Sequence, residues 1–181
     1  MSLLSGQLLM GTDNGISILN TQTGHWQHCC QGTVVLGASQ KPDGSVLVAT
    51  YGKGVYEIDP QAHVRHVYTT ANSPLTDDHV YATFHDRDGG LWVGSLNGDL
   101  LHHTLHGSRR YPVHDVQAIT QLPTGQIAVG TAFGLKLVTA GSDTVRELNY
   151  APSGITDVNP FVTHLLASGL QLWIATDGGG V

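Results

Sequence analysis

The chain has 181 residues and a formal net charge of −6, and only 12% of its residues are charged, about half of the usual ~25%. Glycine occurs 23 times, close to twice its usual share of ~7%. This composition argues against a disordered chain and against a charged helical bundle, and it favours many short strands joined by tight turns. The sequence also shows no basic stripe of the kind that binds nucleic acid.

One short pattern occurs five times along the chain. Each copy has three apolar positions, then Gly or Ala, then Thr or Ser, and then a short loop that contains Gly. The Gly or Ala positions are spaced by 38, 45, 36 and 45 residues, a mean of 41. A period of roughly 40–45 residues is typical of β-propeller blades and of helical HEAT or armadillo repeats. The five copies are QLLMGTDNG, SVLVATYGKG, GLWVGSLNG, QIAVGTAFG and QLWIATDGG.

Strands, rather than helices, are predicted within each period. No period has apolar residues at the 3.6-residue spacing that a helix repeat needs over ten or more residues. The second period instead divides into four runs rich in β-forming residues, at 34–40, 45–50, 54–59 and 64–69. The sequence KPDG joins the first two runs and YGK joins the next two, which is the turn chemistry of β-hairpins. A repeated four-stranded antiparallel meander predicts propeller blades.

The same division, taken in chain order, predicts the limits of the blades. The third and fourth periods repeat the four-strand plan, although the last strand of the third, near SRRYPV, is poor. We expect the chain to begin in a second-type strand, QLLMGT, with no first strand before it. The fold class is therefore all-β, a β-propeller fragment of about four to four and a half four-stranded antiparallel blades that is not a self-closed ring. The predicted blades are 1–32 (incomplete), 33–72, 79–112, 115–150 and 161–181 (incomplete).

The second strand of each period is apolar on both faces, which predicts burial between two neighbouring blades. We expect its Gly or Ala to let adjacent blades approach closely, and Trp92 and Trp173 to be large wedges between blades. Five second strands exceed what a four-bladed ring needs, so we expect a piece of a larger propeller. Its open sheet edges predict packing against the remaining blades of that propeller, or self-association.

Ligands of propellers bind near the central channel, where loops from several blades converge. The two long inter-blade loops at 69–81 and 149–161 share a plan of Pro, then Thr-Asp, then a strand. A purely structural connection is the alternative interpretation of both loops. Aromatic rings with polar neighbours can stack on sugar rings, and an oligosaccharide is the ligand that we expect. The candidate ligand-binding residues are Tyr51, Asp77, Tyr81, Phe133 and Asp157.

Histidines and acidic turns raise the question of a metal site. His102 and His103 are adjacent, so on a strand they face opposite sides, which favours hydrogen-bonded or surface histidines over metal ligands. The acidic turns GTDNG and HDRDGG lack the spacing of an EF-hand, and hairpin turns need Asp, Asn and Gly in any case. We therefore predict no metal and no cofactor. The chain shows no arrangement that singles out a catalytic residue.

The segment DRDGGLWVGSLNGDLLHH, residues 86–103, resembles the two-component regulator propeller repeat. That repeat has an acidic turn, then Leu-Trp-(Val/Ile)-Gly-Thr, then a Gly turn and a strand. The other copies match it, with Leu9, Leu47 and Ala128 at the Trp position of three of them. The resemblance covers nearly the whole chain. It implies a non-catalytic, ligand-sensing and glycan-sensing module from the periplasmic part of a hybrid two-component histidine kinase.

Two alternatives stay open on the sequence alone. A propeller enzyme resembling streptogramin lyase would need a metal and a His pair at the channel of a complete ring. A scaffold propeller would bind a protein and carry no chemistry. The reading frame of the parent gene separates the sensor from the enzyme, because only a sensor kinase continues into a membrane helix and a kinase domain.

Overall fold

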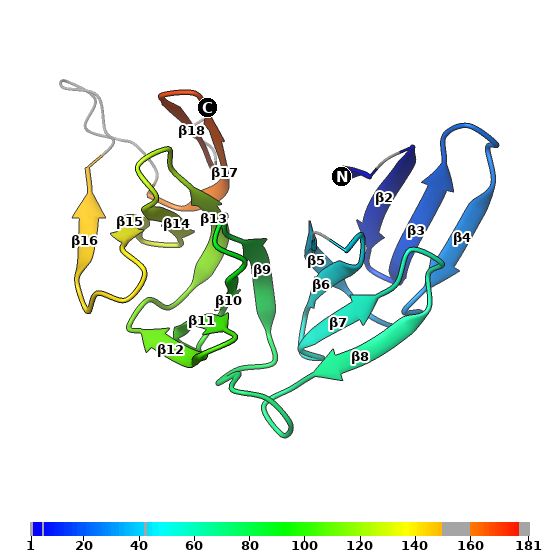
Figure 1. Cartoon of the computed structure of the whole chain (residues 1–181), viewed down its shortest axis with the longest axis horizontal. Coiled ribbons are helices and arrows are strands. Elements are labelled where there is room, and N and C mark those ends of the chain that lie inside the picture. The colour runs from blue at the N-terminus through cyan, green and yellow to red at the C-terminus, as the bar shows by residue number, and fades with distance from the viewer. Residues whose placement is uncertain (1, 5, 42, 150–159, 178–181) are drawn as a thin grey trace.

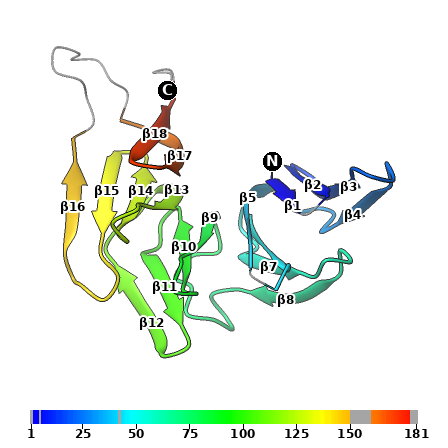
Figure 2. The same ribbon diagram turned by 45° about the horizontal axis from the view of Figure 1, so that its top comes forward.

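The computed structural model of the chain describes residues 2–4, 6–41, 43–149 and 160–177, and all of its regular elements there are β-strands. Four sheets have four antiparallel strands each and a fifth has two, and in every sheet the strand order follows the chain. Figures 1 and 2 show the sheets side by side as the blades of an open arc. The predicted all-β propeller fragment, not closed into a ring, is confirmed. Among the described residues there is no helix that could cross a membrane.

The blades have regular and similar strand lengths. Blade 1 contains β1 (Ser2–Leu4), β2 (Gln7–Thr12), β3 (Gly15–Asn20) and β4 (Trp26–Cys29). Blade 2 contains β5 (Val35–Gln40), β6 (Val46–Thr50), β7 (Val55–Ile58) and β8 (Val64–Tyr68). Blade 3 contains β9 (Val80–His85), β10 (Leu91–Ser95), β11 (Leu100–Thr104) and β12 (Gly107–Tyr111). Blade 4 contains β13 (Val116–Gln121), β14 (Ile127–Thr131), β15 (Gly134–Val138) and β16 (Val145–Leu148), and the fifth sheet contains β17 (Val162–Ser168) and β18 (Gln171–Thr176).

The first blade corrects one expectation. No first strand was expected before QLLMGT, but β1 lies there and pairs antiparallel with β2, with Leu3 opposite Leu8. Gly6, which has a φ of 87°, stands in the turn between them, where its lack of a side chain allows this backbone conformation. A three-residue segment is too short to show the alternation of a strand in the sequence. The strand near SRRYPV also proves regular, because β12 pairs with β11 along its whole length.

The small residues of the second strands are the points where neighbouring blades meet. A methyl group at Gly94 would overlap the side chain of Val116, and one at Gly130 would overlap that of Val162. Each of these valines begins the first strand of the following blade, just before a break in the strand register. The expectation that Gly or Ala lets blades approach is therefore confirmed at these joints.

The two tryptophans of the repeat have different surroundings. Trp92 on β10 is 0% exposed and packs among residues of blades 3 and 4, so it is an inter-blade wedge as predicted. Trp173 occupies the corresponding place on β18 but is 51% exposed. No sheet follows β17 and β18 within the described part of the chain, so the expected wedge has no next blade to pack against there.

Candidate functional site

The turns after the second strands lie at the same edge of the propeller as the loops that lead into the first strands. The backbone N–H of Tyr51, just after β6, donates to the carbonyl of Val34 at 3.0 Å, and that of Leu96, just after β10, donates to His79 at 3.0 Å. The same bond recurs in blade 4 and in the fifth sheet. This edge is called the loop face below, and four of the five candidate residues belong to its turns and loops or to the strand that follows.

Tyr51, His79 and Tyr81 form an aromatic cluster on the loop face. The ring centroids of Tyr51 and His79 are 4.7 Å apart in an edge-on arrangement, and those of Tyr51 and Tyr81 are 6.5 Å apart. Tyr51 comes from blade 2, whereas His79 and Tyr81 flank the start of β9 in blade 3, so the cluster spans two blades. Tyr51 is 49% exposed. Burial, with the nearby Tyr51 and two carboxylates, raises the pKa of Tyr81.

Asp77 holds this cluster in place. One carboxylate oxygen accepts the backbone N–H of His79 at 3.0 Å and lies 2.9 Å from its Nδ1, and the other accepts the N–H of Asn97 at 2.8 Å. Burial opposes the ionisation of Asp77, but these hydrogen bonds outweigh it and lower the pKa of the carboxyl group. Asp77 therefore ties the loop before β9 to the turn after β10 and orients the imidazole of His79.

The remaining two candidates are not part of the cluster. Phe133 lies on blade 4, in the turn between β14 and β15, where it is 77% exposed and its N–H donates to the hydroxyl of Thr131. It belongs to the same loop face, one blade farther along the chain than His79 and Tyr81. Asp157 lies outside the described residues. His79 was not among the candidates, although its place two residues after Asp77 is the spacing at which a carboxylate reaches the next backbone N–H groups.

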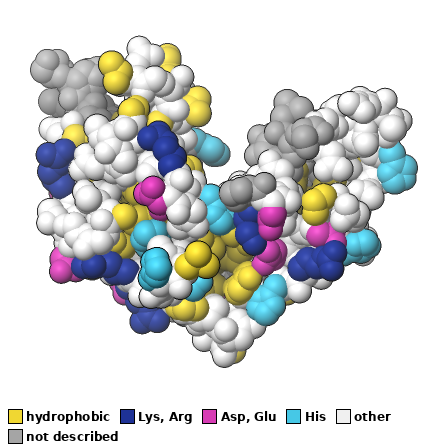
Figure 3. All heavy atoms as spheres, in the orientation of Figure 1, with side chains coloured by type: hydrophobic (Ala, Val, Ile, Leu, Met, Phe, Trp, Pro, Cys, Tyr) yellow, Lys and Arg dark blue, Asp and Glu magenta, His cyan; other side chains and the backbone are white. Residues whose placement is uncertain are grey.

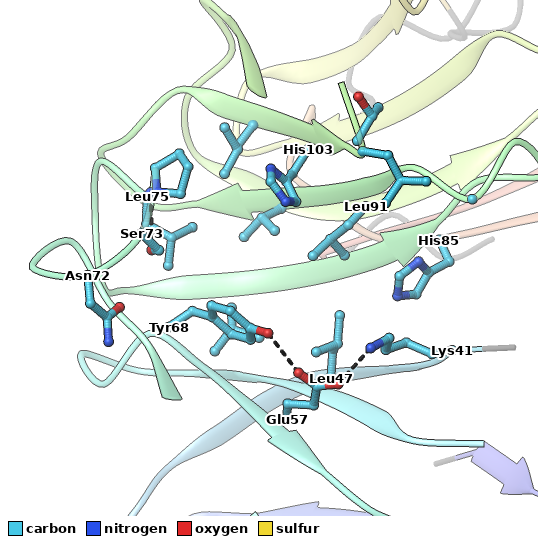
Figure 4. Close-up of a pocket in the computed structure, with 17 residues that line it drawn as sticks. Lys41, Leu47, Glu57, Tyr68, Asn72, Ser73, Leu75, His85, Leu91 and His103 are labelled. Carbon is cyan, nitrogen blue, oxygen red and sulfur yellow. Dashed lines mark hydrogen bonds and ion pairs between the residues drawn. The ribbon is translucent and has the colours of Figure 1, made fainter. Parts of the chain in front are cut away.

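A second candidate site, also not predicted, is a pocket of about 450 Å³ between blades 2 and 3, called the inter-blade pocket below. Figure 4 shows Leu47, Glu57 and Tyr68, from β6, β7 and β8, on one side of it, and Leu91 and His103, from β10 and β11, on the other. In Figure 3 hydrophobic side chains line the hollow between the two arms, and charged side chains and histidines surround it. Its aliphatic walls are Leu47, Val55, Leu75, Leu91, Val93 and Leu101.

An ion pair and a tyrosine form one polar wall of this pocket. Lys41 Nζ lies 2.6 Å from Glu57 Oε1, and the Tyr68 hydroxyl donates to Glu57 Oε2 at 2.7 Å (Figure 4). The hydrogen bond to Glu57 raises the pKa of Lys41, and the same bond lowers the pKa of Glu57. Burial and the bond to Glu57 raise the pKa of Tyr68 to about 12. The carboxylate is therefore held ionised in a partly buried setting.

His85, the last residue of β9, forms another part of the wall, at the same end of the pocket as Lys41 (Figure 4). Both of its ring nitrogens are buried, and neither has a hydrogen-bond partner among the described residues. Burial lowers the pKa of His85, and the positive charge of Lys41 lowers it further. The ring is thus kept neutral, with one N–H donor and one nitrogen acceptor unused.

Blade 3 has a closed cluster at the corresponding place, formed by Asp86, Trp92, His102 and Tyr111 and called the tryptophan cluster below. The indole N–H of Trp92 donates to Asp86 Oδ2 at 2.8 Å, and His102 Nε2 lies 3.1 Å from the same oxygen. The indole stacks on His102, with ring centroids 4.0 Å apart, and on Tyr111 at 5.4 Å. Burial lowers the pKa of His102. The indole N–H of Trp92 and Nε2 of His102 therefore share the carboxylate of Asp86 as their partner.

The histidines that prompted the question of a metal have other partners. His102 binds Asp86, whereas Nδ1 of His103 lies 2.8 Å from the hydroxyl of Ser108. Within the described ranges, no group of three His, Cys, Asp or Glu side chains is arranged to share a metal ion.

Comparisons with known proteins agree with this architecture. The family model described as two component regulator propeller matches residues 74–97. The extracellular domain of the hybrid two-component system BT4673 from B. thetaiotaomicron is similar with a TM-score of 0.75 and 17% identity, over 96% of this chain and 25% of that one. For the extracellular domain of BT3049 from the same organism, the TM-score is 0.70 and the identity 18%, over 97% and 31% of the two chains. The WD40 β-propeller domain of Doa1 gives 0.73 and 16%, over 98% and 60%.

These likenesses confirm the propeller fold and the predicted resemblance to the two-component regulator propeller repeat. The matched segment, 74–97, includes Asp77, His79 and Tyr81 of the loop face. A sequence comparison with curated proteins gave no match. The chain spans 25% and 31% of the two extracellular domains that it resembles.

Proposed function

Because the chain carries a two-component regulator propeller repeat, we propose that it is a ligand-sensing module from the extracytoplasmic, periplasmic part of a hybrid two-component system. The similar structures from B. thetaiotaomicron are extracellular domains of such systems, which supports this assignment. The ligand that we propose is an oligosaccharide, bound without chemical conversion.

The observation that carries this proposal is the aromatic cluster of Tyr51, His79 and Tyr81. Two blades contribute to it, and one of its rings is half exposed at the loop face. A sugar ring offers C–H groups to an aromatic face and hydroxyl groups to nearby polar atoms, and Tyr and His supply both kinds of surface. Because the cluster spans the joint between blades 2 and 3, a ligand bound there would contact both blades at once.

Binding of a broad panel of oligosaccharides to the chain, measured by isothermal titration calorimetry, tests this proposal. We expect at least one oligosaccharide to bind, and Tyr51→Ala to weaken its binding roughly threefold to tenfold, as loss of one stacked ring should. Leu170→Ala is the matched control, because it also removes an exposed apolar side chain but in the turn between β17 and β18. Absence of binding across the panel would contradict an oligosaccharide ligand and favour a protein-binding scaffold.

We also propose that the open face of the fifth sheet packs against a second copy of this chain, as the same face would pack against the next blade of a larger propeller. Leu166 and Trp173 are exposed on it, and apolar side chains on an open sheet favour association. Light scattering should give a mass that rises with concentration, and Leu166→Lys should reduce the rise. A monomer at every concentration would contradict self-association.

A further inference from the structure

Four positions of blade 2 correspond to the tryptophan cluster of blade 3. Leu47 pairs with Glu57 across β6 and β7 in the way that Trp92 pairs with His102 across β10 and β11. Val55 likewise pairs with Tyr68 as Leu100 pairs with Tyr111. Lys41 and Asp86 both follow a first strand and donate their backbone N–H across the next hairpin, to Ser45 at 2.8 Å and to Gly90 at 2.9 Å. The corresponding set in blade 2, called the leucine cluster below, is Lys41, Leu47, Glu57 and Tyr68.

The inter-blade pocket is the space that the tryptophan ring fills in blade 3. All four members of the leucine cluster line it, and Leu47, at the tryptophan position, has a smaller side chain. The volume of about 450 Å³ lies in the range of ~300–1,000 Å³ that is usual for small-molecule sites. An aromatic ring that enters this pocket would give its aliphatic walls the van der Waals contacts that they lack without it.

The polar wall defines what such a ring must carry. In the tryptophan cluster a carboxylate, Asp86, accepts an indole N–H. In the leucine cluster the carboxylate is Glu57, which accepts one bond from Lys41 and one from Tyr68. An ionised carboxylate can accept about four hydrogen bonds, so Glu57 retains capacity for another donor. His85 adds a neutral ring whose nitrogens lack partners among the described residues.

We propose that the inter-blade pocket binds a small planar aromatic molecule that carries an N–H or O–H donor, of the indole or phenol class. The ring lies against the aliphatic walls in the place of the missing tryptophan, and its donor binds the carboxylate of Glu57. This site is separate from the loop face, so it does not depend on the oligosaccharide proposed above. It gives the module a second ligand, held between the same two blades.

Titration of the chain with indole, and separately with 1-methylindole, tests the proposal by calorimetry. Indole is expected to bind about tenfold more tightly than 1-methylindole, because only indole can donate to Glu57. In Glu57→Gln that preference should shrink to about threefold or less. Equal affinity of the two molecules for the wild-type chain, or no binding of indole at millimolar concentration, would overturn the proposal.

Two further variants locate the site. Leu47→Trp should fill the pocket and weaken indole binding at least tenfold, and its circular dichroism and thermal unfolding show whether it folds. Leu170→Ala changes an exposed side chain in the turn between β17 and β18, away from the residues that line the pocket, and should leave indole binding unchanged. If Leu47→Trp folds and still binds indole as the wild type does, the pocket is not the site. If it does not fold, the comparison of indole with 1-methylindole in Glu57→Gln decides the question.

Discussion

The interface between blades 3 and 4 and the interface between blades 2 and 3 use the same four positions in different ways. The tryptophan cluster closes the first with a ring that is 0% exposed, whereas the leucine cluster leaves the second with the inter-blade pocket. The acidic residue also changes place. In blade 3 it is Asp86, just before the second strand, whereas in blade 2 it is Glu57, on the third strand. A repeated backbone can therefore hold a structural wedge in one blade and a binding pocket in the next.

Removing the buried ring of Trp92 should have the largest effect on stability. Trp92→Ala should lower the free energy of unfolding by about 3–5 kcal/mol, because it deletes a fully buried ring, removes the N–H that Asp86 accepts and leaves His102 without its stacked partner. Trp173→Ala is the matched control at the same position of the fifth sheet, and it should cost about 1 kcal/mol or less because its side chain is half exposed. Urea denaturation measures both, and equal losses would contradict the assignment of Trp92 as a wedge.

Placing a tryptophan at the corresponding position of blades 1 and 2 tests whether only blade 2 has room for the ring. Leu9 has the same position in blade 1, where it is buried against Val46 and Val48, so Leu9→Trp should cost about 1–3 kcal/mol by overpacking. Leu47→Trp should change the free energy of unfolding by less than about 1 kcal/mol, because the pocket receives the ring. The two variants are compared by urea denaturation, and a loss at Leu47 as large as that at Leu9 would be evidence against a vacant ring position.

The ion pair of the leucine cluster is expected to have an intermediate effect. Lys41→Met should cost about 1–3 kcal/mol, because it leaves the partly buried carboxylate of Glu57 without its cation. Lys136→Met removes a cation from Glu147, which is largely exposed, and should cost at most about 1 kcal/mol. Thermal unfolding of the two variants measures the difference, and a larger loss for Lys136→Met would show that the polar wall is not held as described.

The smallest effect is a dependence of stability on pH. Burial lowers the pKa of His85 and of His102 in the folded chain, whereas in the unfolded chain both titrate near about 6.5. The unfolded chain therefore binds more protons below that pH, and the free energy of unfolding should fall between pH 7.5 and 5.5. His85→Gln should reduce this fall, and His66→Gln, which removes an exposed histidine, is the control for the loss of a histidine. A stability that stays constant over this range would contradict the buried, neutral state of the two rings.

The sequence predicted the repeated parts of the fold better than the sites. The Gly or Ala and the apolar residues before it mark the second strand of every blade, because burial between two blades demands them there. The strand β1 was missed because three residues show no periodicity. The inter-blade pocket was missed because Leu47 has the pattern of an ordinary core residue, and its meaning depends on Lys41, Glu57 and Tyr68 meeting around it.

At the loop face, too, the sequence predicted some features and missed others. Tyr51 and Tyr81 were predicted as candidates from their places after a second strand and at the end of a long loop, and the structure brings their rings together. Asp77 accepts hydrogen bonds from His79 and Asn97, which no local pattern showed, and its contact with a ligand stays a prediction. Which loop atoms face one another depends on the angle between blades 2 and 3, and no local pattern encodes that angle.

A crystal structure of Leu47→Trp tests most directly the claim that the inter-blade pocket is the place of a missing tryptophan ring. We expect the introduced indole to lie inside the pocket, against the ring of Tyr68, with its N–H toward the carboxylate of Glu57, and blades 2 and 3 to keep their spacing. An indole turned out to solvent beside an unchanged pocket, or blades forced apart, would contradict the claim.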